Sequence, residues 1–195
     1  NPITLPGGCS PANYRVFRSE ALLTLHSLTV RHGNCSGSCG YSPNYGGGIL
    51  VTGSGVAIKY STVSDNYAQD SGGGLANVGT GNLVIEHSTF SDNYASSGGG
   101  GGIYNGSGWL TVSNNTFAFN YAYWGGGIYN VGGGLYTLGA YNSTFTGNSA
   151  GSNGGAIHQV APSSPNFTHV TISGNTAPFG GGIYAASVDT TLRNT

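Results

Sequence analysis

Two aspartates could take part in chemistry together, because the sequence repeats around them. Asp65 and Asp92 occupy the same place in two copies of a repeated segment. If the copies stack, the two carboxylates are neighbours on one turn, where they could hold a cation or support acid–base chemistry on a polysaccharide. The later copies have Phe119, Gly147 and Gly174 at this place, so no acidic stripe develops. We interpret the two aspartates as a solvated turn pair.

The other acids and the histidines form no catalytic pattern. The remaining carboxylates lie at unrelated places in the repeat, at Glu20, Asp70, Glu86 and Asp189. The histidines also occupy different places, apart from a loose alignment of the third with the fifth: His26, His32, His87, His158 and His169. No Ser/His/Asp arrangement and no ligand-spaced histidine pair is visible. We therefore expect surface histidines, no metal or cofactor, and no enzymatic activity.

Aromatic side chains offer a second kind of chemistry. Tyr67, Tyr94 and Tyr121 are in register with the repeat, and Tyr123 and Trp124 extend the patch. Rings side by side at the spacing of stacked coils could stack on sugars or be buried in a subunit contact. The alternative is that the rings pack on one another and only stiffen the protein.

Two short motifs alternate along the chain and set the positions of these side chains. In the first motif a threonine precedes an asparagine by four residues. Its threonines are separated by 27, 27, 28 and 27 residues, at Thr62, Thr89, Thr116, Thr144 and Thr171. An earlier, degenerate copy covers residues 28–34. The second motif is a run of glycines before an aliphatic residue, at Ile49, Leu75, Ile103, Ile128, Ile157 and Ile183.

The length of the repeat predicts the fold. Apolar residues alternate with a period of two between the motifs, and no segment has a helical period with caps. A unit of about 27 residues with three short strands cannot bury its apolar side alone, so units must stack at about 4.8 Å. Parallel crossover connections are right-handed. We therefore expect an all-β, right-handed parallel β-helix (β-solenoid) of about six coils.

Stacking also predicts which residues form columns. The aliphatic residues of the glycine motif should make one inward column. A second inward column should contain Val63, Phe90, Phe117, Phe145 and Ile172, and a third Ile58, Ile85, Val112 and Phe167. The asparagines of the first motif should form a structural ladder, in which each side-chain amide bonds to the next: Asn66, Asn93, Asn120, Asn148 and Asn175.

We expect a single domain over residues 1–195. Residues 1–24 would supply an N-terminal strand and the first coil, and residues 186–195 an incomplete last coil. Residues 33–45 would be a loop insertion that contains two of the three cysteines.

The two motifs resemble those of a known family. The pairing of G-G-A-[ILV] with F-x-x-N is similar to the repeats of the chlamydial polymorphic outer-membrane proteins. Residues 154–157 read Gly-Gly-Ala-Ile, and the second pattern occurs at residues 90–93, 117–120 and 145–148. Residues 110–120, followed by residues 125–130, resemble the wider set of bacterial surface β-helix repeat proteins. The resemblance covers about residues 25–185 and implies a β-helix, with a role as a surface stalk or in adhesion.

The composition of the chain bears on its partners and on its location. The chain has 37 glycines, and its few charges (Lys+Arg 5, Asp+Glu 6) form no basic cluster, which argues against nucleic-acid binding. No apolar run is long enough to span a membrane. Cys9, Cys35 and Cys39 allow three disulfide pairings, between which the sequence does not choose. A disulfide and possible glycosylation sites at five sequons would suit an extracellular or cell-surface location: Asn34, Asn105, Asn114, Asn142 and Asn166.

The function expected from these features is structural. Neither end of the solenoid has an evident cap, so copies could join head to tail into a surface fibre or filament. One alternative is a fragment of an adhesin stalk that binds host or glycan surfaces. Further alternatives are a polysaccharide-active β-helix enzyme and an ice-binding protein, since the threonine column resembles the arrays of ice-binding β-solenoids. Those arrays have a second file, which here would be Tyr60, His87, Asn114, Asn142 and His169.

Overall fold

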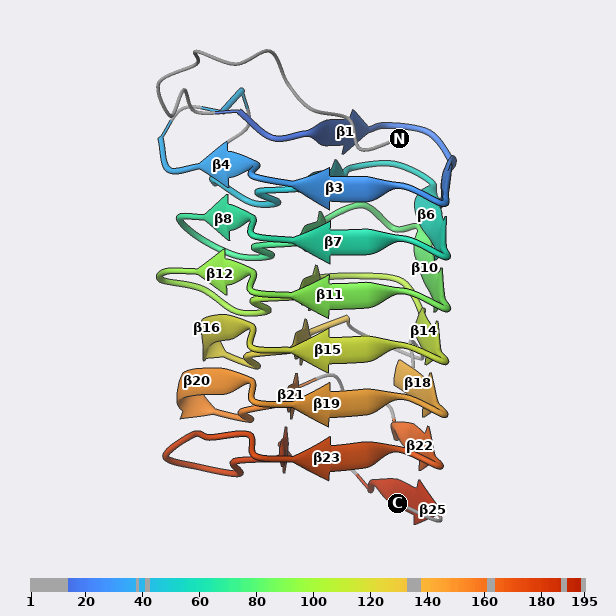
Figure 1. Ribbon diagram of the computed structural model, residues 1–195, viewed down its shortest axis with the longest axis vertical. Coiled ribbons are helices and arrows are strands. Elements are labelled where there is room, and N and C mark those ends of the chain that lie inside the picture. Colours follow the sequence, from blue (N-terminus) through green and yellow to red (C-terminus); the bar gives the residue numbers. More distant parts are fainter. Residues whose placement is uncertain are drawn as a thin grey trace.

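The computed structural model describes residues 14–37, 39–40, 43–132, 138–160, 164–186 and 189–193. In this part of the chain every regular element is a β-strand, and the strands stack in successive coils along one axis (Figure 1). Each strand pairs in parallel with its counterpart one coil away, so the predicted parallel β-solenoid is confirmed. The described residues contain no helix that could cross a membrane.

Two sheets contain seven strands each. The first sheet consists of β1 (Phe17–Ser19), β5 (Ile49–Val51), β9 (Leu75–Asn77), β13 (Ile103–Asn105), β17 (Ile128–Asn130), β21 (Ile157–Gln159) and β24 (Ile183–Ala185). The second sheet consists of β2 (Leu23–His26), β6 (Gly55–Lys59), β10 (Asn82–Glu86), β14 (Leu110–Ser113), β18 (Leu138–Tyr141), β22 (Asn166–Thr168) and β25 (Thr191–Arg193).

Two further sheets complete each coil. The third sheet consists of β3 (Thr29–Arg31), β7 (Thr62–Ser64), β11 (Thr89–Ser91), β15 (Thr116–Ala118), β19 (Thr144–Thr146) and β23 (Thr171–Ser173). The fourth consists of β4 (Asn34–Cys35), β8 (Tyr67–Ala68), β12 (Tyr94–Ala95), β16 (Tyr121–Trp124) and β20 (Ser149–Asn153). Three strands per coil were expected. The short fourth strand of each coil was not predicted. Because β4 is one of these strands, the expected loop over residues 33–45 contains a strand near its start.

The core lies inside the coils, where the side chains of the first three sheets meet. The predicted inward columns are in register, as shown by the pairs Phe90 with Phe117, Ile85 with Val112, and Ile103 with Ile128. The rings of Phe90, Phe117 and Phe145 stack with centroids 5.2 and 4.8 Å apart. Repetition of one residue type at one place thus yields a continuous core that is fully buried in the middle coils, whereas Ile172 and Ile183 of the columns are partly buried.

Two corners of each coil are tight turns of two residues. The first residue has a left-handed backbone with φ between 46° and 63°, which costs a non-glycine residue about 1–2 kcal/mol. One corner, between the second and third sheets, has Ser27, Tyr60, His87, Asn114, Asn142 and His169 at this place. The other, between the third and fourth sheets, has His32, Asp65, Asp92 and Phe119, followed by two glycines. Pairing with the neighbouring coils holds these strained turns in place.

The glycine triplets make the third change of direction, before the first sheet. The leading glycine of each triplet has positive φ, for example 71° at Gly72. A side chain on the middle glycine would collide with the next coil, since a carbon added to Gly73 would lie 2.6 Å from the Tyr94 nitrogen. The triplets therefore permit both the turn and the close stacking of coils.

Two ladders of amide side chains run through the interior. The corner ladder contains Asn66, Asn93, Asn120, Asn148 and Asn175, the asparagines of the first motif. Each Nδ2 donates to the Oδ1 of the next member, at 3.0, 2.9, 2.9 and 2.9 Å. The loop ladder contains Asn77, Asn105, Asn130 and Gln159 at the ends of first-sheet strands, joined at 2.9, 2.7 and 2.8 Å. The loop ladder was not expected from the sequence, because its spacing is irregular and its last member is a glutamine.

Candidate functional site

Three tyrosines of the predicted aromatic surface form a stack on the fourth sheet. Tyr67 pairs with Tyr94, and Tyr94 with Tyr121, in consecutive coils. Their ring centroids are 5.6 and 4.7 Å apart, with nearly parallel planes. Because Tyr94 has a ring over each face, it offers a sugar only its edge. The middle of the stack therefore packs on itself.

Tyr123 and Trp124 do not extend this stack. The register of β16 shifts between Ala122 and Trp124, and the ring of Tyr123 meets that of Trp124 edge to face at 4.8 Å. Trp124 contacts Tyr129 of the first sheet, with centroids 5.9 Å apart. These two residues therefore link the fourth sheet to aromatic side chains of the first sheet.

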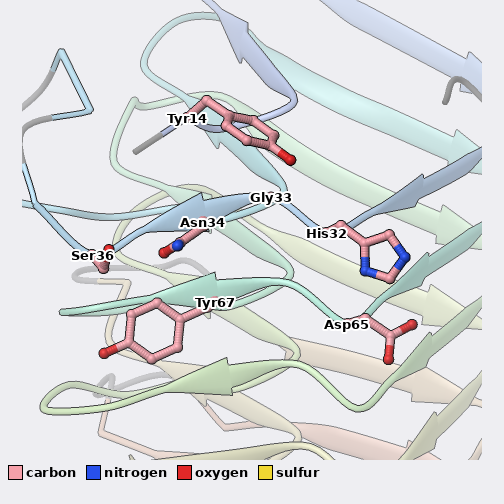
Figure 2. A pocket seen from close by; sticks show the side chains of 7 residues that line it. All are labelled: Tyr14, His32, Gly33, Asn34, Ser36, Asp65 and Tyr67. Atoms are coloured by element: carbon pink, nitrogen blue, oxygen red, sulfur yellow. The ribbon is translucent and has the colours of Figure 1, made fainter. Parts of the chain in front are cut away.

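The stack ends at Tyr67, because the same place in the preceding coil holds Asn34. The short side chain of Asn34 leaves a solvent-open hollow of about 560 Å³ where another ring would fit. Figure 2 shows this hollow, with Tyr14 on one side of β4 and Tyr67 on the other. Its lining consists of Tyr14, His32, Gly33, Asn34, Ser36, Asp65 and Tyr67. One end of the aromatic stack thus faces a space with polar walls.

An arginine and a disulfide hold the chain beside the hollow. The Arg15 guanidinium donates to the carbonyls of Cys39 and Tyr45 at 2.6 and 2.9 Å, and to Gly46 at 3.3 Å. Cys35 and Cys39 are joined by a disulfide. Of the three pairings left open by the sequence this is the one observed, and Cys9 lies outside the described residues. These contacts fix the segment from which Ser36 lines the hollow.

Two titratable side chains stand at the opposite side of the hollow from Ser36. His32 and Asp65 occupy equivalent left-handed turn positions in adjacent coils, and Figure 2 shows the imidazole above the carboxylate. Both are exposed, and no ion pair joins them. Asp92 follows in the next coil, so the expected stacked pair of aspartates is part of a column that begins with a histidine. No group of three or more His, Cys, Asp or Glu in the described residues could hold a metal.

One histidine departs from the expected surface location. His158 is 6 % exposed and lies in the first sheet, whose outward column contains Tyr104, Tyr129 and Tyr184. Its ring centroid is 4.9 Å from those of Tyr129 and Tyr184, and its Nδ1 has no hydrogen-bond partner. Burial lowers the pKa of His158 to about 4 and raises that of Tyr104 to about 12. The prediction of a surface residue was wrong here, because an outward position on this sheet is covered by aromatic neighbours.

The sequons differ in accessibility. Asn105 is a fully buried member of the loop ladder, so its side chain is not available as a glycan acceptor in the folded protein. Asn114 and Asn142 are exposed at left-handed turns one coil apart. Asn34 and Asn166 are half-buried.

The threonine column lies on the outer face of the third sheet, but its second file is not the expected one. The residues that begin with Tyr60 and His87 lie in the corner turns. The file next to the threonines on the sheet is instead Ser64, Ser91, Ala118, Thr146 and Ser173. Ser64 and Ala118 are buried, whereas the flanking Phe119 is 64 % exposed. This face is therefore not the flat array that binding to ice requires.

The hollow was missed in the sequence, although a signal for it exists. The degenerate copy at residues 28–34 aligns His32 with Asp65 and Asn34 with Tyr67, as the strand register shows. When this copy is aligned with the next three copies, Asn34 stands at the position that holds Tyr67, Tyr94 and Tyr121 in the others. The place of Tyr14 could not be read in this way, because it lies in an isolated antiparallel bridge with Asn34 outside the repeat.

Comparison with known proteins gives a family for most of the chain. A family described as a right-handed β-helix region matches residues 26–195. No match was found among curated proteins or among solved structures.

Proposed function

Because the chain belongs to the right-handed β-helix family, we propose that it is a structural protein outside the cell that self-associates through the end of its solenoid. A second copy stacks on the coil that contains β23, β24 and β25, and repetition of this contact builds a surface fibre. Head-to-tail contacts of this kind do not close on themselves and so grow into filaments.

The observation that carries the proposal is the exposure of apolar side chains on this coil. Ile172 and Ile183 are only partly buried, although Phe145 and Ile157, one coil earlier in the same columns, are fully buried. Leu192 is 56 % exposed. Among the described strands, β23, β24 and β25 each pair on one side only, which leaves a row of backbone groups for another strand. A further rung would bury the side chains and satisfy these groups together.

Other features support an extracellular, non-catalytic role. The Cys35–Cys39 disulfide favours an oxidising compartment. The resemblance to chlamydial surface repeats favours the same location. The proposal assigns no catalytic step to the exposed Asp65 and Asp92. An adhesin stalk is a second candidate, which the hollow on the side of the solenoid favours.

The test is the size and shape of the particle. We expect sedimentation to show growth beyond the 19.7 kDa monomer with concentration, and electron microscopy to show rods of constant width. Leu192→Glu places a charge on the proposed contact and should keep the protein monomeric. Trp109→Glu, which changes a 51 % exposed residue on a side loop, is the matched control and should still form rods. A monodisperse monomer at all concentrations, or rods formed equally by the Leu192→Glu protein, would refute self-association.

A further inference from the structure

We propose that the hollow beside β4 is a binding site for a neutral hexose unit of a glycan, whose ring continues the tyrosine stack on the face of Tyr67. The site lies on the side of the solenoid, so this inference goes beyond the structural role and does not depend on it. The argument rests on the place of a missing ring, on the polar groups around it, and on the rigidity of its walls.

The missing ring defines the shape of the ligand. Tyr67, Tyr94 and Tyr121 repeat at the spacing of the coils, and the next place in the column is Asn34. A six-membered ring at this place would lie over Tyr67 as Tyr67 lies over Tyr94, with centroids 5.6 Å apart. The C–H groups of a sugar ring pack favourably on an aromatic face. The volume of about 560 Å³ is in the range of small-molecule sites.

The other end of the same stack has different surroundings. Beyond Tyr121 the column continues with Ser149, again a small residue in place of a tyrosine. At that coil the ring of Tyr123 lies close to β20, since a carbon added to Gly151, two residues after Ser149, would lie 3.1 Å from Tyr123 Cδ2. The hollow thus lies at the Tyr67 end of the stack, whereas a tyrosine ring lies beside the coil that holds Ser149.

The polar lining selects hydroxyl groups. The Asp65 carboxylate accepts hydrogen bonds only, whereas Ser36 and the Tyr14 hydroxyl can both donate and accept. The Asn34 Oδ1 is buried without a hydrogen-bond partner, an unfavourable state that a sugar hydroxyl could relieve once the amide turns toward the hollow. Among the described residues that line the hollow there is no lysine or arginine, and the Asp65 carboxylate repels anions. A neutral sugar, with a hydroxyl on nearly every ring carbon, fits this lining better than a charged one.

Rigid walls make the site effective for a weak ligand. The Arg15 hydrogen bonds and the Cys35–Cys39 disulfide hold the segment that carries Ser36. The Asn34 backbone nitrogen donates to the Tyr14 backbone carbonyl at 2.7 Å. Groups that are fixed before binding lose little conformational entropy when the ligand arrives.

The experiment is saturation-transfer NMR, followed by titration, with the methyl glycosides of glucose, galactose, mannose and N-acetylglucosamine. We expect at least one glycoside to bind in the millimolar range or tighter. Tyr67→Ala should weaken its binding by about tenfold or more, because the stacking face is lost. Tyr121→Ala removes the opposite end of the same stack, so it is the matched control and should bind as the unmodified protein does.

A second variant fills the site instead of removing it. Asn34→Tyr completes the aromatic column, so it should keep the fold and abolish binding. Thermal unfolding checks that all three variants are folded. The proposal is overturned if no glycoside binds, or if the Asn34→Tyr protein binds as well as the unmodified protein. Adenosine serves as a neutral planar probe, and its binding more tightly than every glycoside would show that the site takes flat aromatic rings rather than sugars.

Discussion

The corner ladder and the loop ladder occupy different places in the same coil and support different kinds of turn. In the corner ladder each Oδ1 after that of Asn66 accepts two hydrogen bonds. Asn93 Oδ1, for example, accepts from the Asn66 backbone nitrogen at 3.2 Å and from Asn66 Nδ2 at 3.0 Å. Each Nδ2 also donates to a carbonyl of the preceding coil, as Asn120 does to Phe90 at 2.9 Å. All partners belong to the strands and corners themselves, so this ladder requires a turn of constant length.

The loop ladder uses its donors differently. Asn77 Nδ2 donates to the carbonyls of Gly81 and Ser107 at 2.8 and 2.6 Å, and Asn105 Nδ2 to that of Gly108 at 2.9 Å. These carbonyls belong to the loops that connect the first and second sheets. Because an amide can reach carbonyls at several places in a loop, this ladder tolerates loops of different length.

The first members of the two ladders also differ. Asn66 Oδ1 accepts from the Gly33 backbone nitrogen at 2.9 Å, so the corner ladder ends with its hydrogen bonds satisfied. Asn77 Oδ1 is buried without a partner, because the residue that precedes it in the column is Val51. The comparison teaches that the first acceptor of a ladder is satisfied only where the preceding coil offers a donor. The Gly33 backbone nitrogen is such a donor for Asn66, whereas the Val51 side chain cannot donate to Asn77.

The largest effect should come from interrupting the corner ladder. Asn120→Ala removes the partners of the Asn93 side chain, the Asn93 backbone nitrogen and the Phe90 carbonyl, all buried. We expect a loss of about 3 kcal/mol or more in the free energy of unfolding, measured by urea denaturation. Asn175→Ala, at the half-exposed last member of the same ladder, should cost about 1 kcal/mol. Equal losses would contradict the view that burial makes the ladder important.

A medium effect should come from pH, on the side of the molecule that carries the loop ladder. The pKa of His158 is lowered to about 4, so the unfolded chain takes up a proton at higher pH than the folded protein does. The stability that the folded protein has with His158 neutral is therefore complete above about pH 6.5, the ordinary pKa of histidine, and is lost as the pH falls toward 4.

We expect a decrease of roughly 2 kcal/mol in the free energy of unfolding over this range from His158 alone. The measurement is urea denaturation at a series of pH values, and His158→Phe should remove this part of the dependence. His87→Phe, which changes an exposed histidine, is the control and should leave the dependence as it is. An unchanged profile in the His158→Phe protein would refute the assignment.

The smallest effect should come from extending the loop ladder by one member. Val51→Asn buries an amide whose Nδ2 can donate to the unpaired Asn77 Oδ1, so the lost apolar burial is largely offset. We expect a change in unfolding free energy of less than about 1 kcal/mol. Val63→Asn buries an amide in an apolar column without such an acceptor and should cost about 3 kcal/mol. Similar costs at the two sites would show that the Asn77 oxygen does not lack a partner.

Those parts of the protein that repeat were predictable from the sequence. A period of about 27 residues aligned Phe90 with Phe117 and Asn93 with Asn120, and the structure has these residues paired in adjacent coils. The parallel fold, the inward columns and the corner ladder follow, because stacking forces equivalent residues to meet.

Where the repeat is broken, only the tertiary structure decided the outcome. The loop ladder joins residues at irregular spacing, and the burial of His158 depends on aromatic neighbours in the two adjacent coils. The choice of Cys35–Cys39 and the hollow at Tyr67 depend on a coil in which the motif is degenerate. A repeat determines contacts between equivalent positions, because one translation relates them all. Contacts between non-equivalent positions depend on how each loop packs, and that packing is set by the folded molecule as a whole.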